Sequence, residues 1–242
     1  MITPFNVVHS LLCRFLLLVL FIFISIPLSI CLFSRQKLLV DNKLFMFLEQ
    51  FFYWAALKCT LVPIDYKGLK NIPHEPCIIV ANHQSSIDIP LVGCALRNKP
   101  HIWLSWAELA KGPLLGFIVP RISVLVDMTS PVRGLRTLVQ AIDIVKKHSW
   151  DLIVFPEGGR FTDGKIHPFF GGFAVIAKKV DRPVVPIKII DAAKVYPPKS
   201  FWAFYNPITV IIGKPMTIQP DETEQVFKER VYNWFLQDAK EH

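Results

Sequence analysis

Two short polar motifs, each directly after an apolar run, hold the side chains best suited to chemistry. In the first, Asn82, His83 and Asp88 follow the apolar residues 77–81. If His83 lies in a turn and a helix begins near Ser85, the chain can fold the Asp88 carboxylate back onto the imidazole. That contact fixes the tautomer and stabilises the imidazolium, which leaves the second ring nitrogen as a general base. Ser85 and Asp88 also match a capping box, in which Asp88 is an ordinary helix-capping acid.

The second motif, residues 155–160, joins an acid, two glycines and a cation. Gly158 and Gly159 let the backbone approach a ligand closely. Arg160 carries a planar fork that suits phosphate, and Glu157 can orient this fork or bind a hydroxyl group. The alternative interpretation is a tight turn with a surface ion pair.

Neither motif supplies a nucleophile. The chain has no Gly-x-Ser-x-Gly elbow, and its five cysteines lie at least 17 positions apart with no Cys-x-x-Cys pair. We therefore expect His83 to activate a hydroxyl group of the substrate itself. The cysteine pattern indicates free thiols in a reducing compartment, not a disulfide framework or a zinc site.

The elements that must position these motifs alternate between strands and helices. Apolar runs predict buried strands at residues 77–81, 122–126, 152–155 and 184–190. Helical periodicity predicts helices at residues 86–96, 131–147, 172–179 and 221–240. This alternation indicates an α/β sheet with helices on its faces, in which ligands bind beyond the carboxyl ends of the strands. Residues 61–242 are predicted to form this single domain.

Residues 15–33 form an uncharged apolar stretch of 19 residues, about the length that crosses a bilayer core. A signal peptide would need a small-residue cleavage site, and a buried core helix is rarely apolar on every face, so a membrane anchor is favoured. Basic residues are more frequent after the stretch (Arg35, Lys37, Lys43) than before it (Arg14). This asymmetry predicts a cytoplasmic body.

Residues 44–57 form a second apolar stretch, which is rich in aromatic side chains. It suits the membrane interface, or alternatively an amphipathic helix that packs on the domain. The two stretches can also form a helical hairpin within one leaflet, because Pro27 makes a straight span less certain. We assign residues 1–60 to membrane attachment by one or two helices.

The composition excludes a disordered chain and favours contact with a membrane. Of the 242 residues, 52% are hydrophobic and only 19% are charged, and the formal net charge is +8. Soluble domains carry about 25% charged residues. The basic surface suits an anionic bilayer or an acidic ligand. We expect no nucleic-acid partner, because the chain has no basic helix, no aromatic RNA-binding pattern and no zinc spacing.

Four blocks of this sequence resemble the glycerolipid acyltransferase family, best known through the 1-acylglycerol-3-phosphate acyltransferases. Asn82-His83-x4-Asp88 is similar to the family's N-H-x4-D block, and residues 155–160 to its F-P-E-G-T-R block, with Gly159 in place of Thr. Residues 108–116 resemble the intermediate block, and residues 185–187 the V-P-[VI] block. The blocks occur in the family's order.

The resemblance implies transfer of a fatty acyl group from acyl-CoA or acyl-carrier protein to the free hydroxyl of 1-acyl-sn-glycerol-3-phosphate, giving phosphatidate. His83 would be the general base and Asp88 its partner. Glu157, Gly158 and Arg160 would bind the phosphorylated acceptor. The family chemistry needs no metal and no cofactor. It also implies a lipid membrane as partner, with a bacterial inner membrane favoured and the catalytic domain facing the cytoplasm.

The sequence departs from the family pattern at two basic positions. Trp106-Ala107 and Met128 stand where many lysophosphatidate acyltransferases have a Lys and an Arg that contact phosphate. Arg121, Arg133 and Arg136 lie nearby in the sequence and can substitute. The departures leave two alternatives within the class: an acyltransferase or transacylase acting on another lysophospholipid, or one acting on a lyso-ornithine lipid. A non-catalytic lipid-binding membrane protein is an alternative of another class, which the intact His83–Asp88 motif disfavours.

Overall fold

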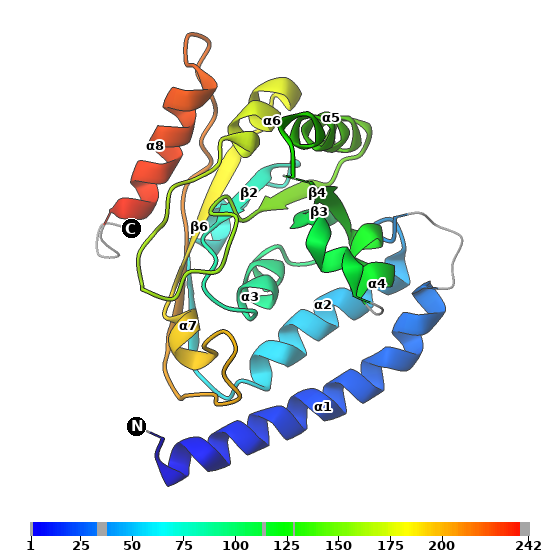
Figure 1. Ribbon diagram of the computed structural model, residues 1–242, viewed down its shortest axis with the longest axis vertical. Coiled ribbons are helices and arrows are strands. Elements are labelled where there is room, and N and C mark those ends of the chain that lie inside the picture. The colour runs from blue at the N-terminus through cyan, green and yellow to red at the C-terminus, as the bar shows by residue number, and fades with distance from the viewer. Residues whose placement is uncertain (1, 33–37, 113–114, 128, 238–242) are drawn as a thin grey trace.

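A seven-stranded sheet forms the centre of the computed structural model, which describes residues 2–32, 38–112, 115–127 and 129–237 (Figure 1). The strand order is β1-β7-β6-β2-β5-β3-β4. Strands β6 and β7 pair antiparallel, and the other described neighbours pair parallel. The predicted mixed α/β sheet is therefore confirmed. The strands are β1 (Ile64–Lys67), β2 (Ile78–Ala81), β3 (His101–Trp106), β4 (Ser123–Val126), β5 (Asp151–Val154), β6 (Val184–Ile190) and β7 (Ile208–Ile212).

Helices cover both faces of the sheet (Figure 1). Helices α5, α6 and α8 pack on one face, and α3 packs on the other with α2 and α1 outside it. The helices are α1 (Pro4–Leu32), α2 (Lys43–Lys58), α3 (Asp88–Ala95), α4 (Leu115–Ile122), α5 (Pro131–Lys147), α6 (Gly172–Val180), α7 (Ala192–Val195) and α8 (Glu224–Leu236), with short 3-10 helices at Leu69–Asn71 and Ala107–Lys111.

The central strands are apolar throughout because both of their faces are buried. On β2, Ile79 and Ala81 enter the core beneath α3, whereas Ile78 and Val80 enter the core beneath α5 and α6. All four side chains are fully buried. A continuous apolar run, without polar alternation, is the pattern expected for such a strand.

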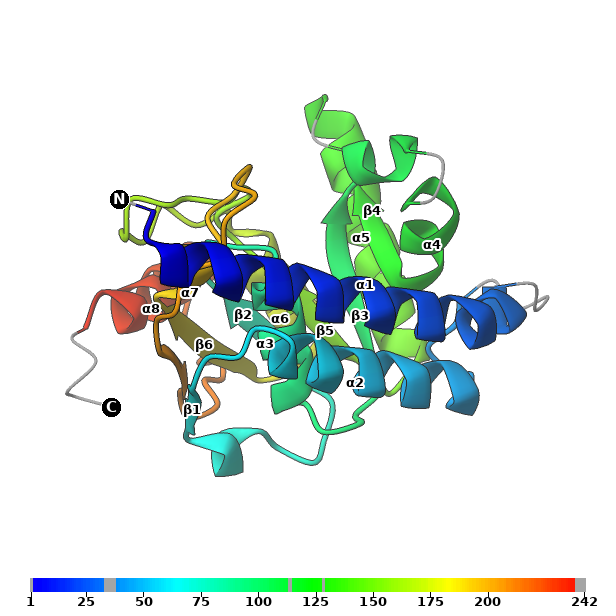
Figure 2. The same ribbon diagram turned by 90° about the horizontal axis from the view of Figure 1, so that it is seen from below.

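Helix α1 runs along the body of the protein, with α2 beside it and α3 behind α2 (Figure 2). It extends beyond the predicted apolar stretch to Pro4 and continues through Pro27. Its inner face is buried, and Cys13 shares a core cluster with Tyr53 of α2 and Leu91 of α3. Both predicted N-terminal helices are thus present. The predicted domain boundary after residue 60 stays a prediction.

Helix α3 approaches α2 closely at Gly93, and this contact gives a stability prediction. A Cβ at Gly93 would lie 2.3 Å from two carbons of the Tyr53 ring. The ring is held in place, because its hydroxyl donates to Glu49 and accepts from Trp103. Gly93→Ala gains about 1 kcal/mol in helix propensity but overpacks the core, which costs about 1–3 kcal/mol. We expect a net loss of up to about 2 kcal/mol in the free energy of unfolding.

The measurement is urea unfolding in detergent micelles, followed by circular dichroism. Gly112→Ala is the matched control, since a Cβ there meets nothing within 4 Å. It is expected to change the unfolding free energy by less than about 0.5 kcal/mol. Equal unfolding midpoints for the two variants would contradict the packing argument.

Candidate active site

The sheet brings the two polar motifs together. Strands β2 and β5 are parallel neighbours, so the segments that follow them leave the same edge of the sheet. The main-chain N–H of His83 donates to Glu157 Oε1 at 2.9 Å, and the N–H of Phe161 donates to the His83 carbonyl at 3.0 Å. The site thus lies beyond the carboxyl ends of the strands, where ligands of α/β sheets bind.

The Asp88 carboxylate folds back onto the His83 imidazole, as the spacing predicted. Nδ1 of His83 lies 2.8 Å from Oδ2 of Asp88, whose side chain is fully buried at the first residue of α3. The same oxygen accepts the main-chain N–H groups of Gln84 and Ser85, at 2.5 and 2.7 Å. Since the carboxylate accepts the Nδ1 proton, the lone pair of the neutral ring is on Nε2.

The capping-box interpretation describes only half of the contacts at this turn. Ser85 does donate its N–H to Asp88, but its hydroxyl donates to the carbonyl of Tyr196 at 2.7 Å instead of capping α3. Ile87 is the residue that precedes the helix, and its side chain makes no cap. One carboxylate therefore both closes the turn and orients His83.

Nε2 of His83 faces the exposed Arg160 side chain. The ring stacks on Phe155, with centroids 4.1 Å apart and planes 11° apart, and Phe155 in turn packs on the buried Trp103. Arg160 donates its Nε–H to His83 Nε2 at 3.0 Å. In the described part of the chain, no hydrogen bond engages the two Nη groups of Arg160. They are therefore available to an anionic ligand at the position of the base.

Glu157 ties the two loops of the site together. It is 5% exposed, and its Oε1 and Oε2 accept the main-chain N–H groups of His83 and His167, each at 2.9 Å. Burial raises the pKa of the Glu157 carboxyl above its usual value, and the two hydrogen bonds oppose that rise. Contact between Glu157 and the acceptor stays a prediction, because both carboxylate oxygens already accept main-chain N–H groups.

Asn82 and Gly158 fix the backbone on either side of the base. The amide of Asn82 donates to the carbonyl of Ile189 and accepts its N–H, at 2.9 and 2.7 Å, which joins the end of β2 to β6. Gly158 has a φ of +66°, and a Cβ there would lie 2.6 Å from the Phe170 ring. Both the left-handed backbone and the close approach require glycine at this position.

The predicted supporting cations lie on α4 and α5, toward the β4 edge of the sheet. Arg133 Nη1 is 3.1 Å from Asp127 Oδ2 at the start of α5, and Arg121 on α4 stacks on the Phe117 ring. The described contacts place neither in the hydrogen-bonded cluster around His83. Met128 lies outside the described residues.

Two exposed aromatic side chains lie beside Gly158. A Cβ at Gly158 would lie 2.6 Å from the Phe170 ring and 3.4 Å from the Trp106 ring, and these side chains are 57% and 45% exposed. Leu109 and Phe117 are exposed on the segments that follow β3. Trp103, by contrast, is buried.

No group of three or more His, Cys, Asp or Glu side chains is placed to hold a metal ion among the described residues. The five cysteines are unpaired in the structure.

The position of Glu157 predicts a stability effect for Glu157→Gln. The amide keeps one oxygen for one main-chain N–H, but its NH2 group then faces the other N–H, which loses its acceptor. An unsatisfied buried donor costs about 1–3 kcal/mol, so we expect a loss of that size in the free energy of unfolding. Glu108→Gln, at an exposed side chain, is the control and is expected to be neutral. An unfolding midpoint for Glu157→Gln equal to that of the control would contradict the assignment.

Comparison with known proteins finds similarity to acyltransferases. Residues 63–190 match the model of the acyltransferase family. A 1-acyl-sn-glycerol-3-phosphate acyltransferase of Pseudomonas aeruginosa is 30% identical over 186 residues, covering 76% of this chain and 68% of that protein. A chloroplastic 1-acyl-sn-glycerol-3-phosphate acyltransferase of Brassica napus is 30% identical over 168 residues, covering 67% and 48%.

A lyso-ornithine lipid O-acyltransferase of Pseudomonas aeruginosa is also similar, with 28% identity over 137 residues, 57% of this chain and 52% of that protein. This chain spans about half the length of the plant relatives it matches. The crystal structure of the 1-acyl-sn-glycerophosphate acyltransferase PlsC from Thermotoga maritima superposes with a TM-score of 0.78 at 24% identity. That match covers 100% of this chain and 98% of the other, and it establishes the shared fold.

Proposed function

This chain belongs to the acyltransferase family, and we propose that it transfers a fatty acyl group from a thioester to the free hydroxyl of 1-acyl-sn-glycerol-3-phosphate, giving phosphatidate. The observation that carries the proposal is the His83–Asp88 contact with Arg160 at the open nitrogen of the imidazole. It places a base and an anion-binding fork side by side, as a phosphorylated alcohol requires. The donor is acyl-CoA or acyl-carrier protein.

In the proposed reaction His83 Nε2 removes the proton of the acceptor hydroxyl as its oxygen attacks the thioester carbonyl. The new C–O bond forms, the C–S bond breaks, and the departing thiolate takes the proton back from the imidazolium. Asp88 stabilises that imidazolium through Nδ1 and needs no proton of its own. The thioester supplies the activated acyl group, so we expect no metal or cofactor.

Arg160 would change partners when the acceptor binds. In the structure its Nε–H occupies His83 Nε2, the atom that must accept the hydroxyl proton. A phosphomonoester offers the guanidinium charged, two-pronged hydrogen bonds, which are about twice as strong as neutral ones. Acceptor binding would thus draw Arg160 off the base and place the hydroxyl where the guanidinium was. Glu157 and Asn82 would hold the loops that carry these two side chains.

We propose that α1 and α2 lie in one leaflet of the membrane and do not cross it. The most apolar 18-residue window within Pro4–Cys31 has a mean hydropathy of 2.7, and only 17% of that window is buried. The body contacts this helix toward both of its ends, from His9 beside the Ala203 carbonyl to Cys31 in a cluster with Ile122 of α4. A helix that crossed the bilayer would carry those body contacts into hydrocarbon. The basic charge that follows the helix favours a body on the cytoplasmic side, in a bacterial inner membrane.

The outer face of α1 gives a prediction for membrane binding. Phe15 and Phe23 are 61% and 74% exposed. Replacing both with serine is expected to lower partition into anionic vesicles in 1 M salt by about tenfold or more, because each aromatic side chain that leaves lipid costs more than 1 kcal/mol. The measurement is vesicle sedimentation. The control replaces Val132 and Val139, which are exposed on α5, with serine; equal binding of the two double variants would contradict the proposal.

A genetic test addresses the reaction in cells. Expression in bacteria whose own lysophosphatidate acyltransferase is conditionally inactive is expected to restore growth under the restrictive condition. The His83→Ala variant, expressed to the same level in the membrane fraction, is expected to fail. No growth with well-expressed, membrane-bound parent protein would overturn the proposed acceptor.

A second acceptor class is kept as a candidate, because Trp106 stands where many family members have a lysine and because a lyso-ornithine lipid acyltransferase is among the relatives. A less anionic head group would need fewer cations than lysophosphatidate. A non-catalytic lipid-binding protein would have no use for the oriented base.

A further inference from the structure

We propose that the loop of residues 196–205 is a second membrane-contact element, which enters the same lipid surface beside α1. The inference rests on the membrane association proposed above. It concerns a segment that begins about 165 residues after the end of α1 and that contacts the turn of His83 through the Tyr196 carbonyl, which accepts the Ser85 hydroxyl.

Arg14 fixes the loop at the level of α1. It is the only charged residue between Pro4 and Leu32. Its Nε and Nη2 donate to the Phe201 carbonyl at 3.2 and 2.9 Å, and Nη2 donates to the Ser200 carbonyl at 3.2 Å. Its guanidinium also lies over the rings of Tyr196 and Phe201, 5.1 and 5.5 Å from their centroids. A charge within an apolar helix is costly unless it is paired, and here the loop supplies the partners.

Ser10 makes a second attachment one turn away. Its hydroxyl accepts the N–H of Ala203 and lies 2.9 Å from the Ala203 carbonyl, and both residues are fully buried. Farther along, the ring of Tyr205 meets those of Phe5 and His9 edge to face, with centroids 6.2 and 6.1 Å apart. The loop therefore cannot withdraw from α1 without breaking buried hydrogen bonds.

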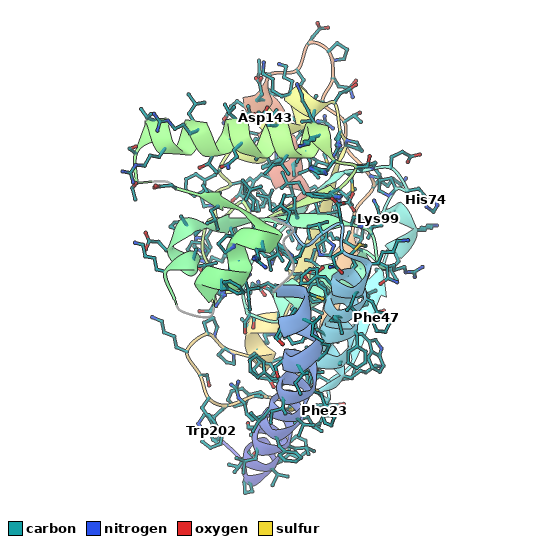
Figure 3. The ribbon with its side chains drawn as sticks, turned by 90° about the vertical axis from the view of Figure 1, so that its right-hand side faces the viewer. Phe23, Phe47, His74, Lys99, Asp143 and Trp202 are labelled. Atoms are coloured by element: carbon teal, nitrogen blue, oxygen red, sulfur yellow. The ribbon has the colours of Figure 1, made fainter. Side chains whose placement is uncertain are left out.

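The outward side of the loop has the chemistry of a membrane interface. Phe201 and Tyr205 are 54% and 52% exposed, and Tyr205 lies beside the exposed Phe5 on α1. Figure 3 shows Trp202 at the same end of the molecule as Phe23 of α1. Lys199 is exposed within the loop and adds positive charge that suits anionic head groups. Aromatic rings with a polar edge, flanked by lysine, are typical of the interfacial zone of a bilayer.

A lipid surface is the occupant that these observations favour, because the exposed aromatic side chains continue the apolar outer face of α1. That face includes Val8, Phe15 and Leu18, each more than half exposed. A contact beside α1 would also fix how the body is rotated about the helix axis. That rotation sets the distance between His83 and the membrane surface. A lysolipid in the membrane must bring its hydroxyl group to His83 across this distance.

The experiment places an environment-sensitive nitrobenzoxadiazole label at position 201 in the full chain. Phe201→Cys is made after Cys59 and Cys94, the two native thiols that are not fully buried, are replaced by serine. Phe15→Cys on α1 is the positive control. Val226→Cys is the matched negative control, because it is 56% exposed on α8, which packs on the other face of the sheet from α1 (Figure 1). The probe membrane is a phosphatidylglycerol–phosphatidylethanolamine vesicle with doxyl-labelled acyl chains.

On addition of vesicles, the label at position 201 is expected to shift to shorter emission wavelengths and to be quenched, as at position 15. The label at position 226 is expected to stay unchanged. If position 15 responds and position 201 behaves like position 226, the loop proposal is overturned while membrane attachment by α1 stands. If positions 15 and 201 both fail to respond, the membrane association itself is overturned, and the loop proposal with it.

Discussion

Replacing His83 with alanine is expected to lower kcat/KM for acyl transfer by about 10²–10⁴-fold, the usual contribution of a general base. The imidazole is oriented by Asp88 and stacked on Phe155, so its Nε2 is preorganised for proton transfer. Alanine removes that atom, and no other imidazole is hydrogen-bonded to Asp88 in the described chain. The measurement is the initial rate of transfer from labelled acyl-CoA to lysophosphatidate by purified protein.

The exposed His74 provides the control. His74→Ala is expected to keep the parent rate, and both variants are expected to keep the parent's circular dichroism spectrum. A folded His83→Ala protein that retains more than about a tenth of the parent rate would contradict the assignment of the base, since that loss is below the range for general-base catalysis.

Replacing Arg160 with alanine is expected to cost about 10- to 150-fold in kcat/KM for a phosphomonoester acceptor. A hydrogen bond to a charged group is worth about 1.5–3 kcal/mol, and Arg160 is the cation in contact with the base. Arg160→Lys is expected to recover only part of this loss, because a point charge cannot reproduce a two-pronged contact. Steady-state kinetics over a range of acceptor concentrations measures both variants.

Arg97, which follows α3, is the matched control, because it is also an exposed arginine. Arg97→Ala is expected to leave kcat/KM unchanged. The loss for Arg160→Ala is also expected to shrink with a lysolipid that lacks a phosphomonoester. Equal losses for the Arg160 and Arg97 variants, or an equal Arg160 loss with every acceptor, would contradict a phosphate contact.

The sequence predicted the central strands β6, β2 and β5 and the edge strand β4, but it missed β1, β3 and β7. β6 (Val184–Ile190) was predicted to the residue, because a strand that is buried on both faces is apolar without interruption. β1 was missed, because it is a four-residue strand whose exposure alternates. β3 was missed because it mixes His101 and Ser105 with apolar residues. β7 is apolar and could have been found, but nothing in the sequence shows that it runs antiparallel to β6.

Within the site, the contact between His83 and Asp88 was predictable because it closes a local turn. The contacts of His83 with Glu157 and Arg160 were not, because they require β2 and β5 to be neighbours. Strand order is a property of the whole sheet, and no local pattern encodes it. For the same reason the sequence did not reveal that both Glu157 oxygens accept main-chain N–H groups, and its contact with the acceptor stays a prediction.

At the N-terminus, hydropathy predicted an apolar helix but not its full length. The helix begins at Pro4, and its first half carries Ser10 and Arg14, which interrupt the apolar pattern. Both side chains are satisfied by the loop around Ala203, far away in the sequence. Such polar residues in an apolar helix indicate a contact with the body. The sequence alone does not identify which segment of the body makes that contact.

The most direct test of the proposed reaction is a competition among acceptors in a single vesicle preparation. Purified protein receives labelled acyl-CoA or acyl-carrier protein together with equal amounts of lysophosphatidate, lysophosphatidylethanolamine, lysophosphatidylglycerol and lyso-ornithine lipid, and the labelled products are quantified by mass spectrometry. We predict that labelled phosphatidate forms fastest and disappears in the His83→Ala protein. Faster labelling of any of the other three lipids by the parent protein would contradict lysophosphatidate as the acceptor.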